Sequence, residues 1–247
     1  MPDKELQRAM HTLMTRRIYF GHQSVGANII AGLKDLYAAT DDRRLNFLAL
    51  TDAPLPAGGV FAESRIGKNT DPESKCRAFT SAVESLHGDS IDIAIMKFCY
   101  IDFTQDTDAG KLFALYAGTI DSLSRAFPSV TFVHVTAPLT VRTPWWKKIA
   151  KRILGRQESS DIENTRRNEF NTLLLEKHRN EPVFDLAAAE STYPDGARCS
   201  FDMDGKTAYS LIPAFTDDGA HLNPVGRRIA AAALVRTLAS AAERRSR

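Results

Sequence analysis

The stretch that decides the fold is "RRIYFGHQSVGANIIAGLKDLY", residues 16–37, because its hydrophobic pattern changes halfway along. Residues 16–22 carry the β-branched and aromatic side chains that are typical of a short strand. A strand that runs directly into a helix predicts the first unit of an α/β fold, with Ser24 at the joint. The helix is indicated by apolar residues that recur at the spacing of one helix face, namely Val25, Ile29, Ile30, Leu33, Leu36 and Tyr37.

Ser24 has two interpretations at this position. A serine at the start of a helix is a preferred N-cap, since its hydroxyl accepts a hydrogen bond from the first turn. The same position also suits a nucleophile, because it lies at the carboxyl edge of a strand and near the positive end of a helix dipole. Catalysis would require a base, an acid that orients the base and an oxyanion site elsewhere in the chain.

The composition indicates an ordinary globular protein. The 247 residues, 43% hydrophobic and 25% charged, suffice for one large α/β domain, and without internal repeats we predict a single domain over 1–247. A net charge of +2 is too small to indicate a nucleic-acid partner. The sequence contains no apolar run of membrane-spanning length and no signal peptide, so we expect a cytoplasmic protein. Three widely spaced cysteines, Cys76, Cys99 and Cys199, suit a reducing compartment.

The rest of the chain alternates between apolar stretches and helical patterns. Such alternation predicts a three-layer α/β/α sandwich around a five-stranded parallel sheet, whose ligands bind at the carboxyl ends of the strands. The predicted strands are 16–22, 45–51, 91–100, 130–137 and 182–187. The predicted helices are 25–39, 73–87, 108–126, 161–179 and 224–244.

A second informative stretch is "TDDGAHLNPVG", residues 216–226, just before the last helix. Asn223 followed by Pro224 is typical of a helix start, with Asn223 as the N-cap. Asp218 precedes His221 by three residues, a spacing that lets the carboxylate reach one imidazole nitrogen while the other faces the cleft. A histidine oriented in this way can accept a proton from a serine. The alternative is that both residues are polar loop residues that cap the helix.

The two motifs together resemble the SGNH, or GDSL-type, hydrolase family. That family has its nucleophile after the first strand, and its Asp and His lie three residues apart near the C-terminus. The resemblance implies a flavodoxin-like SGNH-hydrolase fold, with Ser24 as nucleophile, His221 as base and Asp218 as the residue that orients it. "FGHQSVG" stands where the family has its Gly-Asp-Ser block, so Gln23 replaces the usual aspartate.

The resemblance also implies an oxyanion hole, from which this chain departs in part. The family uses the serine N–H, a glycine N–H after the second strand, and an asparagine after the third strand. Here the glycine is Gly67, in "RIGKNTDP", while "KFCYIDF" (97–103) contains no asparagine. We therefore expect Ser24 and Gly67 as donors and consider Asn69 the nearest replacement for the third, which indicates a divergent branch.

The sequence indicates neither a metal nor a cofactor. "DMDGKT" (202–207) resembles an aspartate-nucleophile phosphatase motif but does not follow a buried first strand, and it lacks the Gly and Glu positions of a calcium loop. The histidines outside "DGAH" show no ligand spacing, and we expect His22 to be packed or solvated. These histidines are His11, His22, His87, His134 and His178.

An insertion at 143–160 interrupts the fourth strand-to-helix connection. Within 143–157, two tryptophans and aliphatic residues share one helix face, and five lysines and arginines occupy the other. A basic amphipathic helix of this kind can contact a membrane surface peripherally. The alternative, which we favour, is a lid or dimer helix whose apolar face covers protein. Either way, its basic face would attract an anionic substrate.

These observations predict a serine ester hydrolase, and the resemblance implies a substrate such as a carbohydrate that carries an O-acetyl or similar acyl group. Two alternatives stay open. The same site could transfer an acyl group to a sugar hydroxyl, or the chain could be a catalytically silent module that binds a glycan or a membrane. The sequence does not indicate the oligomeric state.

Overall fold

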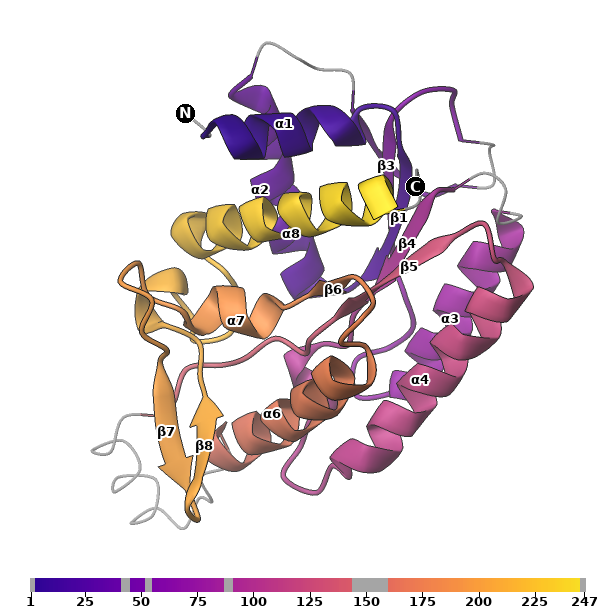
Figure 1. Cartoon of the computed structure of the whole chain (residues 1–247). Helices are drawn as coiled ribbons and strands as arrows, with labels where there is room; N and C mark the ends of the chain where they lie inside the picture. Colours follow the sequence, from indigo (N-terminus) through magenta and orange to yellow (C-terminus); the bar gives the residue numbers. More distant parts are fainter. Residues whose placement is uncertain (1–2, 41–44, 52–54, 87–90, 144–159, 245–247) are drawn as a thin grey trace.

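Six short strands form one parallel sheet in the computed structural model, which describes residues 3–40, 45–51, 55–86, 91–143 and 160–244 (Figure 1). They are β1 (Arg17–His22), β2 (Asn46–Ala49), β3 (Val60–Arg65), β4 (Ile93–Met96), β5 (Thr131–Val135) and β6 (Val183–Phe184). The order across the sheet is β2-β3-β1-β4-β5-β6, and every pairing is parallel. Without the edge strand β2, this is the flavodoxin-like order, so the predicted fold class is confirmed.

The prediction of five strands was wrong by one. The additional strand is β3, which pairs with β1 along its whole length, from Arg17 opposite Val60 to His22 opposite Arg65. Only its first half is buried, because apolar residues end at Ala62 and polar ones follow. Three apolar residues are too few for a period of two to stand out in the sequence. The predicted second strand exists as β2, but at the edge of the sheet.

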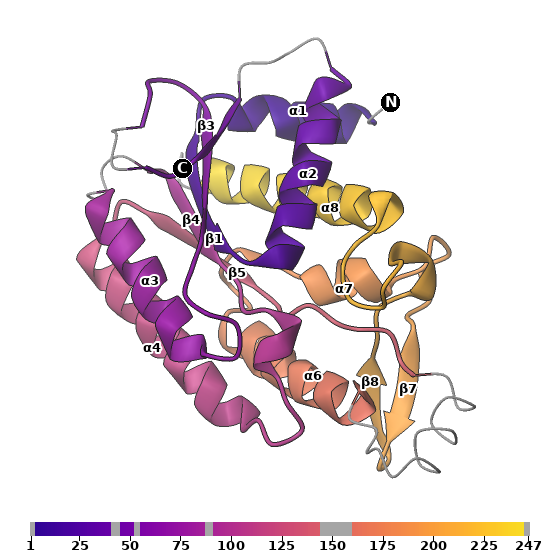
Figure 2. The ribbon, with the colours of Figure 1, turned by 180° about the vertical axis from the view of Figure 1, so that it is seen from behind.

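Helices cover both faces of the sheet, as the two opposite views show (Figures 1 and 2). Helices α1, α2, α7 and α8 share one apolar core with the strands, and α3, α4 and α6 share the other. The helices are α1 (Lys4–Leu13), α2 (Ser24–Ala38), α3 (Pro72–Ser85), α4 (Ala109–Ala126), α6 (Ser160–Lys177), α7 (Leu186–Ser191) and α8 (Pro224–Arg244), with short 3₁₀ turns η1 (Tyr100–Asp102) and η2 (Pro213–Phe215). None of the helices in the described ranges is long and apolar enough to cross a membrane.

The sequence predicts no helix or strand between the strand 182–187 and the helix 224–244. In the structure, α7 begins at Leu186, inside the predicted strand, and is followed by an antiparallel hairpin of β7 (Ser200–Met203) and β8 (Lys206–Tyr209). Its turn is the Asp-Gly pair of "DMDGKT", with Asp204 at φ 55° and Gly205 at φ 75°. Two successive positive φ values are typical of the type I′ turn that suits a tight hairpin. The motif therefore serves as a hairpin turn in this chain.

Candidate active site

Ser24 is the first residue of α2 and does not cap it. The N-cap is Gln23, whose backbone is extended and whose side chain makes no capping bond. The N-cap interpretation of Ser24 was therefore wrong, because α2 begins at Ser24 itself, one residue earlier than the predicted helix. Gly26 permits this sharp turn, since a Cβ at Gly26 would lie 2.3 Å from the Cβ of His22.

The structure brings Ser24, His221 and Asp218 into one chain of hydrogen bonds. The Ser24 hydroxyl lies 2.9 Å from His221 Nε2, and His221 Nδ1 lies 2.6 Å from Asp218 Oδ2. A carboxylate accepts only, so Nδ1–H donates to Asp218 and Nε2 is left to accept from the serine hydroxyl. Residues 197 positions apart thus meet in the relation of nucleophile, base and orienting acid.

Backbone bonds keep the Asp218 carboxylate ionised and in place. Its Oδ1 accepts from the N–H groups of Ala220, at 2.9 Å, and His221, at 2.8 Å. These bonds, that of the His221 N–H above all, hold the pKa of Asp218 well below its usual range. The carboxylate therefore stays charged over the whole neutral range and fixes the tautomer of His221.

The loop that carries His221 is fastened to the helix that carries Ser24. Asn223 Oδ1 accepts from the N–H groups of Val225 and Gly226, at 3.0 and 3.1 Å, so Asn223 is the N-cap of α8 as predicted. The Leu222 N–H donates to Asn28 Oδ1 on α2 at 3.2 Å. Because α2 and α8 also pack against each other, the serine and the histidine rest on one rigid pair of helices.

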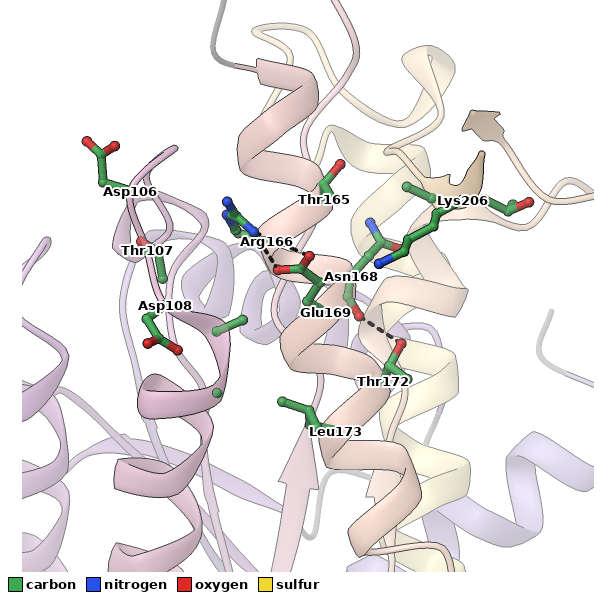
Figure 3. A pocket seen from close by; sticks show the side chains of 14 residues that line it. Asp106, Thr107, Asp108, Thr165, Arg166, Asn168, Glu169, Thr172, Leu173 and Lys206 are labelled. Atoms are coloured by element: carbon green, nitrogen blue, oxygen red, sulfur yellow. Dashed lines mark hydrogen bonds and ion pairs between the residues drawn. The ribbon is translucent and has the colours of Figure 1, made fainter. Parts of the chain in front are cut away.

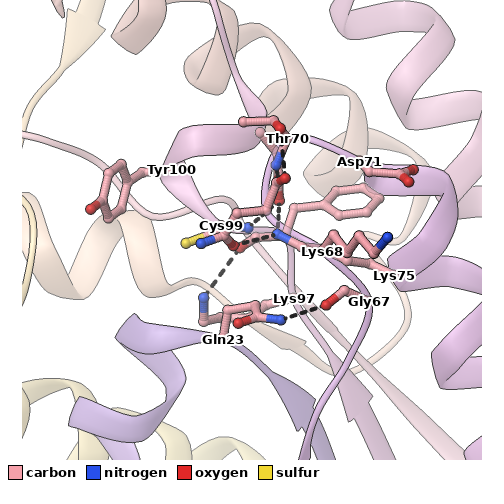
Figure 4. Close-up of polar contacts among 12 residues, drawn as sticks. Gln23, Gly67, Lys68, Thr70, Asp71, Lys75, Lys97, Cys99 and Tyr100 are labelled. Carbon is pink, nitrogen blue, oxygen red and sulfur yellow. Dashed lines mark hydrogen bonds and ion pairs between the residues drawn. The ribbon is translucent and has the colours of Figure 1, made fainter.

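Gln23 joins the serine turn to the turn that contains Gly67. Its Nε2 donates to the carbonyl oxygens of Ile66 at 2.7 Å and Gly67 at 3.0 Å (Figure 4). Gly67 has a φ of 55°, and a Cβ there would lie 2.4 Å from the Lys75 backbone nitrogen. Glycine is therefore required at this position both by its conformation and by the close approach of α3.

A buried ion pair holds the same turn from its other side. Lys75 Nζ donates to Asp102 Oδ2 at 2.5 Å and to Asn69 Oδ1 at 3.2 Å, and both charged side chains are fully buried. Asp102 Oδ1 accepts the Thr70 N–H at 2.9 Å, which steadies Thr70 at a φ of 66° (Figure 4). Because a lysine only donates, the amide oxygen of Asn69 must face it, and the amide NH₂ is the end that faces elsewhere.

The loop after β4 places two residues at the site that the sequence did not single out. Cys99 Sγ lies 3.9 Å from Ser24 Oγ, and the Tyr100 ring packs edge-to-face on His221 with centroids 5.5 Å apart. The Cys99 N–H donates to Asp102 Oδ2 at 2.7 Å, so the buried ion pair fixes this loop as well. The only available signal was position, because this is where the resemblance implies an asparagine.

His22 lies beside Ser24 in sequence but makes its bonds elsewhere. Its Nδ1 lies 2.7 Å from the Gln23 carbonyl oxygen and its Nε2 lies 2.8 Å from Glu63 Oε2. Both ring nitrogens are thus engaged, and the side chain is buried. His22 therefore supports the turn by packing, in agreement with the expectation from the sequence.

One cluster in the described ranges brings metal-ligating groups together, namely His134, His178 and Glu181, with ligand atoms within 4.8 Å. His134 Nε2 and His178 Nδ1 each bond one oxygen of Glu181, at 3.1 and 2.8 Å. The two rings stack, with centroids 3.5 Å apart and planes 20° apart. An imidazole binds a metal in its ring plane, so two stacked rings do not both direct a lone pair at one ion. The cluster fits a carboxylate shared by two histidines better than a metal.

This cluster predicts a loss of stability in acid. Burial above all lowers the pKa of His134 to about 4, below the 6.5 of a free histidine. The unfolded chain therefore binds the proton first, and stability present above pH 6.5 is lost as the pH falls toward 4, by up to about 3 kcal/mol. Melting temperatures between pH 7 and 4 should fall less steeply for His134→Gln. The exposed His11→Gln serves as the control, and equal slopes in all three proteins would contradict the prediction.

A pocket of about 710 Å³ lies between α6, the start of α4 and the hairpin (Figure 3). Ser24, Asp218 and His221 do not line it. Several of its polar side chains already bond within the protein: Arg166 pairs with Glu169 at 3.0 Å, and Asn168 bonds the backbone of Tyr209. The pocket is therefore separate from the candidate site, and Asn168 in its wall joins α6 to the hairpin.

The tryptophan-containing part of the insertion lies outside the described residues, which stop at 143 and resume at 160. The two described ends are fastened together: Arg142 pairs with Asp161 at 2.8 Å, and Thr143 Oγ1 lies 3.2 Å from Ser160 Oγ. The lid and membrane interpretations of 143–157 both stay predictions.

The fold and the arrangement of Ser24, His221 and Asp218 define the architecture of a flavodoxin-like α/β protein with a serine–histidine–aspartate constellation at the carboxyl edge of its sheet. A protein from Desulfitobacterium hafniense DCB-2, assigned provisionally to the G-D-S-L family of lipolytic proteins, matches with a TM-score of 0.50 at 9% identity, over 90% of this chain and 99% of that chain. A protein from Streptococcus pneumonia, assigned provisionally as a platelet activating factor, matches with a TM-score of 0.50 at 14% identity, over 94% and 89%.

The chain therefore has the fold of the SGNH, or GDSL-type, hydrolases. No family model matches the sequence, and no curated protein matches it.

Proposed function

We propose that this protein is a serine ester hydrolase with Ser24 as nucleophile, His221 as general base and Asp218 as the residue that orients it. The observation that carries the proposal is the pair of contacts at His221, 2.9 Å to Ser24 Oγ and 2.6 Å to Asp218 Oδ2. Such a relay raises the reactivity of a hydroxyl that would otherwise be a weak nucleophile at neutral pH.

In the proposed reaction, Ser24 Oγ attacks the ester carbonyl carbon while His221 Nε2 takes the hydroxyl proton. The Asp218 carboxylate stabilises the resulting imidazolium. His221 then returns the proton to the leaving alcohol, which leaves an acyl group on Ser24. A water molecule, deprotonated by the same histidine, releases the acid and restores the serine.

Hydrogen-bond donors are needed where the carbonyl oxygen becomes negative. We propose the N–H groups of Ser24 and Gly67 and the amide NH₂ of Asn69. The start of α2 favours negative charge near Ser24. Gln23 fixes the Gly67 turn beside the serine, and Lys75 sets the amide orientation of Asn69. Rigid donors of this kind supply much of the rate enhancement in acyl transfer.

For the substrate, we propose a carbohydrate that carries an O-acetyl or similar small acyl group. The support is the likeness of the serine and DGAH blocks to those of SGNH hydrolases. A panel of acetylated sugars and simple aryl esters tests this proposal, with wild type and Ser24→Ala measured side by side. We expect wild-type turnover, labelling of Ser24 by a fluorophosphonate, and neither in Ser24→Ala. Folded wild type that does not react with the fluorophosphonate would contradict the proposal.

A further inference from the structure

Helix α6 buries a stripe of polar side chains. Buried polar groups need partners, because a polar group without one is costly in the interior. The partners lie in the irregular segment after β5: the Ala137 N–H donates to Asn171 Oδ1 at 2.6 Å, and the Thr140 N–H donates to Asn164 Oδ1 at 3.1 Å. These hydrogen bonds therefore fix the segment after β5, at the carboxyl edge of the sheet, to α6. The stripe consists of Asp161, Asn164, Arg167 and Asn171.

Arg167 is the central member of this stripe, with 1% of its surface exposed. Its Nε and Nη2 both donate to the Tyr100 carbonyl oxygen, at 3.1 and 2.9 Å. Its Nη1 donates to Thr140 Oγ1 at 3.0 Å and Asn164 Oδ1 at 2.8 Å, and Nη2 also reaches Glu163 Oε2 at 3.3 Å. One end of the guanidinium is thus anchored on α6 and Thr140, and the other end grips Tyr100.

Burying the charge of an arginine at this position costs folding free energy. Burial lowers its pKa to about 10, and the carboxylate that it bonds, on Glu163, is itself partly exposed. An apolar side chain would fill the same space without the cost of desolvating a charge. The planar guanidinium places two donors on the Tyr100 carbonyl oxygen and therefore holds it in one place. The flexible ammonium of a lysine would not do so.

The position of Tyr100 matters because its ring touches the proposed base. The ring meets the His221 imidazole edge-to-face, with centroids 5.5 Å apart and planes at 80°. His221 needs such support, since 37% of its side chain is exposed and its two ring nitrogens are engaged with Asp218 and Ser24. A contact that fixes the Tyr100 backbone therefore also fixes the ring that packs against the imidazole.

We propose that Arg167 is a positioning residue for His221. By gripping the Tyr100 carbonyl, it holds the Tyr100 ring against the imidazole and so keeps Nε2 aimed at the Ser24 hydroxyl. Its kinetic consequence rests on the proposed esterase function, whereas its geometric consequence does not. Misplacing a catalytic group by about 1 Å can lower a rate by roughly 10²-fold.

The kinetic test compares Arg167→Lys with Arg166→Lys. Lysine keeps the charge of Arg167 but cannot place two donors on one carbonyl. Arg166 is the matched control, since it is the next residue of the same helix and pairs with Glu169 near the surface. We expect Arg167→Lys to lower kcat by roughly 10-fold to 10²-fold with KM nearly unchanged, and Arg166→Lys to match wild type.

A second measurement does not depend on activity. The ring current of Tyr100 should shift the NMR signal of the His221 Cε1–H group, and Tyr100→Leu should remove that shift. We expect Arg167→Lys to move the signal toward its position in Tyr100→Leu, while Arg166→Lys leaves it in place. If this shift appears and no ester is hydrolysed, the positioning role stands and the proposed function fails.

A double-mutant cycle closes the test. If Arg167 acts through the Tyr100 ring, Arg167→Lys should add little to the loss already caused by Tyr100→Leu. Full multiplication of the two losses would overturn the proposal, as would a folded Arg167→Lys with wild-type kcat and an unmoved His221 signal. If Arg167→Lys does not fold, Tyr100→Leu alone decides, because wild-type kcat in that variant would also overturn the proposal.

Discussion

Replacing Ser24 and His221 together by alanine is expected to slow ester hydrolysis little more than replacing either one alone. In the proposed mechanism the two side chains act as a unit through their 2.9 Å contact, so removing one leaves the other without its catalytic role. Each single change should lower kcat by roughly 10⁴–10⁶-fold. The rate enhancement that remains would come from substrate binding and the oxyanion donors. Single-turnover kinetics on an activated ester, with circular dichroism to verify folding, make the measurement. Multiplication of the two losses would show that the residues do not share a step.

Asp218→Asn completes this series with a smaller loss. The asparagine oxygen can still accept the N–H groups of Ala220 and His221, so the loop should keep its shape. Its NH₂, however, would face His221 Nδ1 and favour the tautomer whose Nε2 carries the proton and cannot take another from Ser24. We expect a loss of roughly 10²–10⁴-fold, and wild-type turnover in this variant would remove Asp218 from the mechanism.

The sequence located these three residues because each lies beside a local signal. The strand-to-helix change positions Ser24, and the Asn-Pro start of α8 positions His221 and Asp218. Signals of this kind depend on a few neighbouring residues, and the flavodoxin-like order then follows from alternating strands and helices. The carboxyl edge of the sheet brings the two motifs together whatever their separation along the chain.

The sequence did not predict the contacts between distant polar residues, because no local signal lies beside those residues. Lys75, Asp102 and Arg167 look like ordinary surface residues in one dimension, and charged side chains are usually exposed. Only the packing of α3 and α6 against the loops after β3 and β4 shows that they are buried and bonded. A helix with a polar buried stripe, such as α6, also lacks the apolar periodicity that indicates which face is inside.

The proposed third oxyanion donor gives the second large expected effect. Asn69→Asp should lower kcat by roughly 10²–10³-fold with KM nearly unchanged, because the donor acts on charge that develops only in the transition state. In the wild type, Lys75 Nζ lies 3.2 Å from the amide oxygen of Asn69. The aspartate keeps an oxygen at that position, so the turn should keep its conformation. It lacks the NH₂ group and adds a negative charge beside the oxyanion. Steady-state kinetics on one activated ester provide both constants.

Asn69 is a better probe of the proposed oxyanion hole than the buried Lys75–Asp102 ion pair next to it. Removing Lys75 would leave the Asp102 charge buried and unpaired, at a cost of about 3–5 kcal/mol of folding free energy, and so would mix stability with catalysis. Asn69→Ala should show a loss similar to that of Asn69→Asp, or somewhat smaller, since it removes the donor without adding charge. Lys68→Ala, at the exposed neighbouring position, is the matched control and should keep wild-type kcat. If Asn69→Asp turns over like wild type, Ser24 and Gly67 are left as the proposed donors, and the 3.9 Å contact of Cys99 with Ser24 becomes the next to test.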